Sequence, residues 1–111
     1  NLIFKLDIKK LTAMIYFETG SFVNLNSLLN AYYQSVSIKI KKNENILNRH
    51  RCFIKILRKL ENVLNGNRNY SELIALEKNL EMENVSEKYW LLEKITEAEN
   101  ILNPKTGNVR N

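Results

Sequence analysis

Apolar residues recur every three or four positions along almost the whole chain, and this spacing restricts the fold more than any other feature. It places apolar side chains on one face of an α-helix, whereas a half-buried strand requires alternation of apolar and polar residues. No sustained alternation is present. The chain also has only 3 Gly and 1 Pro, too few for the many turns of a β-sandwich or barrel. The sequence therefore predicts an all-α fold.

Two amphipathic helices are predicted in the first 40 residues. The first covers residues 4–19, and Gly20 is its expected C-terminal stop. Its apolar face consists of Phe4, Ile8, Leu11 and Ile15. The second helix carries the apolar series Phe22, Leu25, Leu29, Tyr32, Val36 and Ile40. Because the connection between them is so short, we expect the two helices to pack antiparallel.

Three further helices are predicted after a polar pause at residues 41–45. The third ends at Asn65 and Gly66, and its apolar series is Ile46, His50, Phe53, Leu57, Leu60 and Leu64. Ser71 is the expected N-cap of the fourth helix, whose apolar residues are Leu73, Leu76 and Leu80. Ser86 and Glu87 open the fifth, and Pro104 closes it. The prediction is an antiparallel array of about five helices.

The length of 111 residues allows one domain, which we place at residues 1–103, followed by a tail at residues 104–111. The chain opens with Asn1 and not Met, so we expect it to be part of a longer polypeptide. Its longest apolar runs fall far short of a membrane span. A single cysteine, Cys52, excludes an internal disulfide and favours a cytoplasmic location.

Residues 15–29 carry a pattern centred on a glycine turn. Aromatic Tyr16 lies four residues before Gly20, Phe22 lies two residues after it, and an amphipathic helix follows. This pattern resembles the inner half of a tetratricopeptide-type repeat. The resemblance implies that the chain reverses at Gly20 and that Tyr16 and Phe22 clamp the two helices together.

Two further segments extend the resemblance, at residues 52–60 and 85–94. With the glycine turn, they look like the C-terminal region of large uncharacterised bacterial proteins built from tetratricopeptide-like helices. The resemblance covers roughly residues 10–98. It implies a helical scaffold at the end of an α-solenoid and brings no catalytic residue.

The net charge of +5 is unevenly distributed. Residues 39–59 hold eight Lys or Arg against the single acid Glu44, whereas residues 71–111 hold eight acids against five bases. The acidic C-terminal helices could neutralise the basic third helix from within, or its basic face could bind an acidic ligand. That face contains Arg51, Lys55, Arg58 and Lys59.

Few residues could support catalysis. His50 and Cys52 lie two positions apart on one predicted helix, so their side chains point away from each other. We expect His50, on the apolar series, to be a core-edge residue, and Cys52 has only Arg51 as an adjacent charge. No glycine-rich phosphate loop is present. The sequence predicts no catalytic residue, metal site or cofactor.

These observations favour a non-enzymatic helical scaffold that binds a partner protein. Adjacent aromatic residues cannot both face one core. For Tyr33 and Tyr89 we favour an interface with a neighbouring helix of the same or another chain, and the alternative is a core ring whose hydroxyl reaches solvent. The candidate partner-binding residues are Tyr33, Arg51, Lys55, Arg58, Lys59 and Tyr89. Nucleic-acid binding through the basic segment from Lys39 to Lys59 is the alternative.

Overall fold

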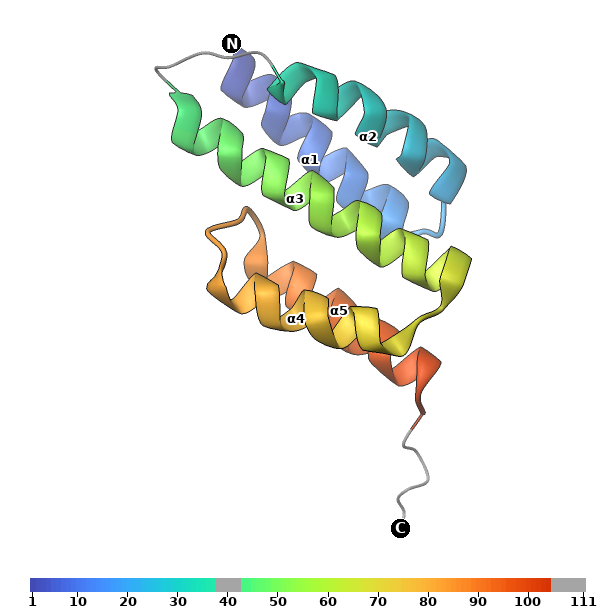
Figure 1. Cartoon of the computed structure of the whole chain (residues 1–111). Coiled ribbons are helices and arrows are strands. Elements are labelled where there is room, and N and C mark those ends of the chain that lie inside the picture. The colour runs from blue at the N-terminus through green and yellow to red at the C-terminus, as the bar shows by residue number, and fades with distance from the viewer. Residues whose placement is uncertain (38–42, 105–111) are drawn as a thin grey trace.

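The computed structural model describes residues 1–37 and 43–104, and over these ranges the chain is helical with no β-strand (Figure 1). This confirms the all-α prediction. The elements are α1 (Leu2–Glu18), α2 (Phe22–Val36), α3 (Glu44–Asn62), the π-helical turn η2 (Val63–Asn67), α4 (Tyr70–Met82) and α5 (Lys88–Leu102). Predicted apolar position Ile40 and the predicted tail from residue 105 lie outside the described residues.

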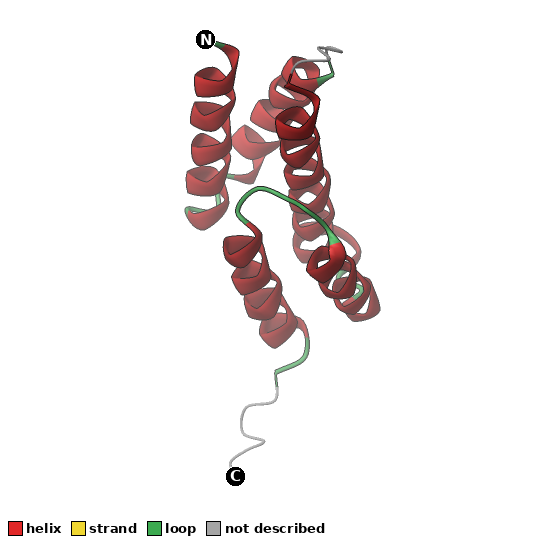
Figure 2. Ribbon diagram, turned by 90° about the vertical axis from the view of Figure 1, so that its left-hand side faces the viewer, coloured by secondary structure: helices red, strands yellow, loops and turns green. Residues whose placement is uncertain are grey.

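The helices form a five-helix domain with antiparallel packing. Helices α1 and α2 make one hairpin, α4 and α5 make another, and α3 lies between the two hairpins (Figure 1). A view from the side shows α1 and α5 along one edge of the domain and α3 and α4 along the opposite edge (Figure 2). The central position of α3 leaves one of its long faces open between α2 and α4.

The first turn follows from its glycine. Gly20 has φ +72°, a left-handed conformation that glycine adopts without steric cost. The N–H of Ser21 donates to the carbonyl of Tyr16 at 2.8 Å, and the N–H of Gly20 donates to that of Phe17 at 3.2 Å. This pair of bonds is a Schellman motif, and it confirms the predicted stop of the first helix.

One predicted boundary is close and one is wrong. The helical turns of α3 continue through η2 to Asn67, just beyond the predicted stop at Asn65 and Gly66, and Arg68 then reverses the chain at φ +53°. Asn69, not Ser71, is the N-cap of α4, because its side chain accepts a 3.0 Å bond from the Ser71 N–H. Ser and Asn both favour this position, so the sequence alone did not separate them.

The core is formed by one face of each helix, as the spacing predicted for α2 to α5. Its largest fully buried side chains include Tyr32, Phe53, Leu25, Leu29, Leu57, Leu60, Leu73, Leu80 and Leu91. Helix α1 differs, because Phe4, Ile8, Leu11 and Ile15 are exposed and the residues that face the core are Leu6, Ala13 and Phe17. Helix α1 has two apolar faces, and spacing alone does not say which one the bundle covers.

Aromatic contacts join the N-terminal hairpin to α5. The ring of Phe17 contacts Phe22 edge to face with centroids 5.7 Å apart, and it contacts Trp90 at 5.8 Å. Phe17 therefore joins the predicted Phe22 in the contact between α1 and α2. The predicted Tyr16 is partly buried and also packs against the core.

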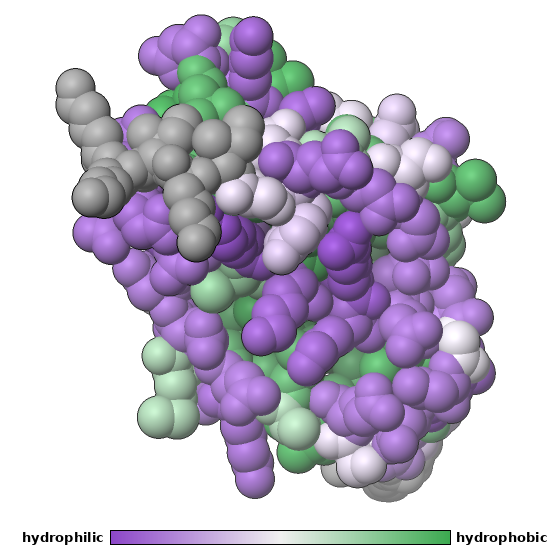
Figure 3. Space-filling model, turned by 45° about the horizontal axis from the view of Figure 1, so that its top comes forward, coloured by the Kyte–Doolittle hydropathy of each residue, from purple (hydrophilic) through white to green (hydrophobic). Residues whose placement is uncertain are grey.

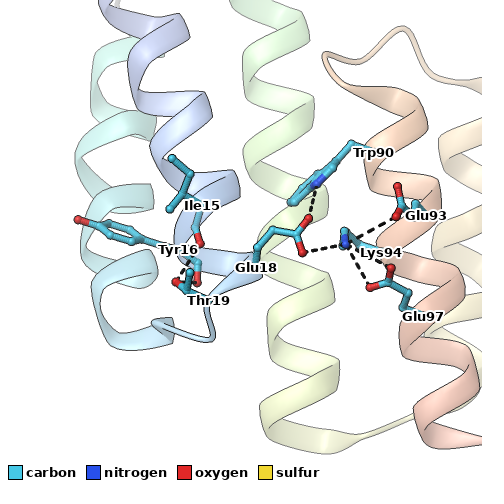
Figure 4. A network of polar contacts seen from close by, with 8 residues as sticks. All are labelled: Ile15, Tyr16, Glu18, Thr19, Trp90, Glu93, Lys94 and Glu97. Atoms are coloured by element: carbon cyan, nitrogen blue, oxygen red, sulfur yellow. Dashed lines mark hydrogen bonds and ion pairs between the residues drawn. The ribbon is translucent and has the colours of Figure 1, made fainter.

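A polar cluster forms the second tie between α1 and α5 (Figure 4). Glu18 accepts hydrogen bonds from Lys94 Nζ at 2.9 Å and from Trp90 Nε1 at 3.0 Å. Glu97 also binds Lys94, which is buried. Burial lowers the pKa of Lys94, but the bonds to Glu18 and Glu97 outweigh it and raise that pKa overall. The buried ammonium is therefore charged and paired.

Candidate partner-binding groove

Five of the six predicted partner-binding residues line a single groove between α2 and α3. The groove has a volume of about 560 Å³. Its lining consists of Tyr33, Asn48, Arg51, Cys52, Ile54, Lys55, Arg58 and Lys59. We call this surface the basic groove. Figure 3 views the molecule obliquely from above and shows hydrophilic side chains around a hydrophobic floor.

Two of the four cations in the basic groove are held by protein groups. Arg51 forms an ion pair with Glu44 at 2.7 Å and donates from Nε to the carbonyl of Val36 at 2.8 Å. Arg58 donates from Nη2 to Asn30 Oδ1 at 2.7 Å, and its guanidinium lies over the Tyr33 ring. These contacts fix both arginines and join α3 to α2.

The other two cations are unpaired. Among the described residues, the side chains of Lys55 and Lys59 make neither a hydrogen bond nor an ion pair, and both are exposed. Both also line a smaller cavity of about 90 Å³ toward α4, together with Cys52 and Glu83. The ammonium groups of Lys55 and Lys59, one helical turn apart on α3, therefore face solvent between α2 and α4.

Within the described residues, the acidic helices do not neutralise the cations of α3 through ion pairs. Over the described ranges, no ion pair joins a cation of α3 to a carboxylate of α4. Acidic residues near α5 instead pair with α1 or with α5 itself, as in the 3.0 Å contact between Lys10 and Glu87. Glu72 of α4 and Glu83 at its C-cap line cavities that α3 lysines also line, but neither forms an ion pair with them. Lys39, Lys41 and Lys42 lie outside the described residues.

Cys52 lies at the edge of the groove in a setting that keeps its thiol protonated. Burial raises the pKa of Cys52, and the 3.4 Å hydrogen bond that Sγ donates to Glu83 raises it further. A nucleophilic cysteine requires the opposite shift, toward thiolate at neutral pH. The surroundings of Cys52 therefore suit a structural residue.

His50 is buried, which confirms its expected place at the core. Its Nδ1 is hydrogen-bonded to the Tyr32 hydroxyl, and its Nε2 lies 3.7 Å from Asp7 Oδ1. Burial lowers the pKa of His50 and raises the pKa of Tyr32. We therefore assign Tyr32 as the donor and Nδ1 of neutral His50 as the acceptor, which places the single N–H proton of the imidazole on Nε2, toward Asp7. The sequence carried a hint, since both polar residues lie on apolar series.

Tyr89 is the predicted site residue that the structure does not bring to the groove. It lies on α5 with 85% of its surface exposed. Conversely, sequence reasoning missed Glu44 and Asn30, which hold the two arginines. Glu44 lies seven residues before Arg51, two helical turns away on the same face, and this spacing was the available signal. Asn30 lies on another helix, so no spacing in the sequence linked it to Arg58.

Other site types are absent from the described part of the chain. There, no group of three His, Cys, Asp or Glu side chains is placed to hold a metal ion. None of its helices is both long enough and apolar enough to cross a membrane. Comparisons with protein families, with curated proteins and with solved structures find no match to this chain.

Proposed function

We propose that this chain is a non-enzymatic protein-interaction module whose basic groove binds an acidic segment of a partner protein. The observation that carries the proposal is the pair Lys55 and Lys59, which lie on one face of α3 beside the exposed ring of Tyr33 and form no ion pair within residues 1–37 and 43–104. Charges left without partners at the surface can form ion pairs with a ligand, and an aromatic ring supplies an apolar anchor.

The walls of the groove suit a rigid platform. Arg51 and Arg58 tie α3 to the α1–α2 hairpin, so these two side chains have little freedom to lose when a partner binds. The Schellman turn at Gly20 is the part of the hairpin that resembles a tetratricopeptide-type repeat. As part of the same proposal, the domain is a helical-repeat scaffold that acts in the cytoplasm.

The non-enzymatic part of the proposal is supported by the two residues best suited to chemistry. His50 is buried and bonded to Tyr32, and the pKa of the Cys52 thiol is raised mainly by burial. Neither group has the accessible base or the thiolate that nucleophilic catalysis requires.

Nucleic-acid binding through the same surface is the second candidate, favoured by the four cations that line it. Two observations favour a protein partner instead. Arg51 is already paired with Glu44, so fewer charges remain for phosphates than the several contacts typical of nucleic-acid binders. One face of the Tyr33 ring is covered by Arg58, which removes that face as a stacking platform for a base.

A charge-reversal titration tests the proposal. The double variant Lys55→Glu/Lys59→Glu would be titrated with a fluorescent polyglutamate peptide, and with oligothymidylate of equal length, near physiological salt. We expect wild type to bind the peptide and the variant to lose at least tenfold in affinity. The matched control is Lys5→Glu/Lys78→Glu, which changes net charge by the same amount through two exposed lysines on α1 and α4 outside the groove, and it should bind like wild type.

Two outcomes would overturn the proposal. Wild type could bind oligothymidylate more tightly than the peptide, which would establish the nucleic-acid alternative. Equal losses in Lys55→Glu/Lys59→Glu and in Lys5→Glu/Lys78→Glu would show that only net charge matters and that the groove has no role.

A further inference from the structure

Helix α1 carries a stripe of large apolar side chains that the domain leaves uncovered. Phe4, Ile8, Leu11 and Ile15 are 65%, 48%, 52% and 60% exposed, respectively. We call these four residues the α1 stripe. They lie roughly opposite Leu6, Ala13 and Phe17, the residues with which α1 packs on the bundle. Figure 2 shows α1 at the outer edge of the domain, with no helix beyond it.

The shape of the α1 stripe suits another helix as its partner. Steps of four, three and four residues give a seam about 60° wide on the helix surface. A helix that lies against a broad apolar surface needs a stripe of at least about 100°, whereas a narrow seam is the pattern of paired helices. The spacing therefore favours helix pairing over a membrane surface.

The same spacing makes the α1 stripe complementary to itself. Steps of four, three and four read the same in both directions, so a second copy of α1 running antiparallel presents matching positions. In that register Phe4 faces Ile15 of the other copy and Ile8 faces Leu11. A two-fold axis passes through the middle of the stripe, as in an isologous dimer.

Charges beside the α1 stripe are compatible with this register. In an antiparallel pair the same flank of each helix faces its copy, so Lys5 comes nearest to Thr12 and Asp7 nearest to Met14. Neither contact places like charges opposite each other, and the stripe itself carries none. Like-charge juxtaposition, which would reject a second copy, is therefore avoided.

The exposed apolar area of the α1 stripe limits the size of this interface. Four half-exposed large side chains present on the order of 400 Å² of apolar surface per copy. Two copies would bury about 800 Å² through the stripes alone, with a further contribution from the flanks. Stable complexes bury more than about 1,200 Å², so the pair forms reversibly and at high protein concentration.

We propose that the α1 stripe is a homodimer interface in which α1 packs antiparallel against α1 of a second copy. This surface is separate from the basic groove, so dimerisation and partner binding are independent. The Lys55→Glu/Lys59→Glu variant should dimerise like wild type, which separates a failure of this proposal from a failure of the proposed function.

Sedimentation equilibrium tests the proposal on the full chain. From low micromolar to near millimolar concentration, the average mass of wild type should rise from that of one chain toward twice that value. Ile8→Lys and Leu11→Glu should each remain monomeric over the same range. Val23→Glu is the control, because Val23 is a highly exposed apolar residue on α2 outside the stripe. It should dimerise like wild type.

Mixing the two stripe variants tests the register. An equimolar mixture of Ile8→Lys and Leu11→Glu should regain the mass of a dimer, because the antiparallel register places the new Lys against the new Glu. Circular dichroism of each variant should match that of wild type, because both substituted side chains are exposed. A parallel pair would not bring these two side chains together, and its mixture would stay monomeric.

Three results would overturn the proposal. Wild type could stay monomeric at every concentration. The mixture could fail to regain the dimer. Monomeric wild type could bind phosphatidylglycerol vesicles while Ile8→Lys does not, which would make a lipid surface the occupant of the α1 stripe.

Discussion

The guanidinium of Arg58 lies 5.4 Å from the centroid of the Tyr33 ring and joins the two walls of the basic groove. The same group donates a 2.7 Å hydrogen bond to Asn30. Arg58 is thus a structural cation, in contrast to Lys55 on the same face, which has no partner in the described part of the chain. Stability and partner binding should therefore respond differently to changes at these two positions.

Replacing Arg58 separates its contact with Tyr33 from its charge. Arg58→Ala should lower the free energy of unfolding by about 1 kcal/mol, since it removes an exposed cation–π contact and one hydrogen bond. Arg58→Lys keeps the charge and should retain most of the polyglutamate affinity while losing part of that stability. Urea denaturation and peptide titration measure the two effects. An Arg58→Lys variant that binds as weakly as Arg58→Ala would show that charge is not what the peptide recognises.

Tyr32→Phe should be strongly destabilising because it leaves Nδ1 of buried His50 without its donor. An unsatisfied buried acceptor costs about 1–3 kcal/mol, and urea denaturation at pH 7.5 would measure it. Tyr33→Phe is the matched control. Because the Tyr33 ring is exposed, the loss of its hydroxyl should change the free energy of unfolding little. Equal effects of the two substitutions would contradict the role assigned to the buried bond.

The lowered pKa of His50 predicts a pH dependence. Burial is the main cause, so the unfolded chain takes up a proton at higher pH than the folded chain does. The contribution of neutral His50 to the free energy of unfolding should be full above the ordinary histidine pKa of about 6.5, and it should decline as pH falls below that value. Urea denaturation between pH 7.5 and 5 would show the decline. His50→Gln should be less stable at neutral pH but flat over this range, and a variant that kept the wild-type slope would point to other groups.

Glu18 links α1 to α5, and its pKa is lowered by the hydrogen bonds from Lys94 and Trp90. Glu18→Gln should lower the free energy of unfolding at pH 7 by about 1 kcal/mol. A lowered carboxyl pKa stabilises the fold above the unfolded value, and this stabilisation is lost as pH falls through the folded-state pKa, so the difference between variant and wild type should shrink in acid. Glu93→Gln, whose carboxylate is 3.9 Å from Lys94, is the control and should have a smaller effect.

Helical spacing predicted the five helices and most of the core because one face of each helix from α2 to α5 is apolar and the other is polar. It chose the wrong face of α1, where both faces are apolar and only the tertiary arrangement decides which is covered. The basic groove could be predicted because its four cations share one face of α3. The groove contacts of Asn30 and the pairing of Tyr32 with His50 depend on helix packing, which no local pattern encodes.

Mapping the bound peptide by amide chemical shifts tests the central claim most directly. Uniformly ¹⁵N-labelled protein would be titrated with the polyglutamate peptide and its amide spectrum followed to saturation. We predict that the amides that shift most belong to Tyr33 and to α3 between Asn48 and Lys59. Saturable shifts centred on the α4–α5 hairpin, or no shifts at near-millimolar peptide, would contradict the assignment of the basic groove as the partner-binding site.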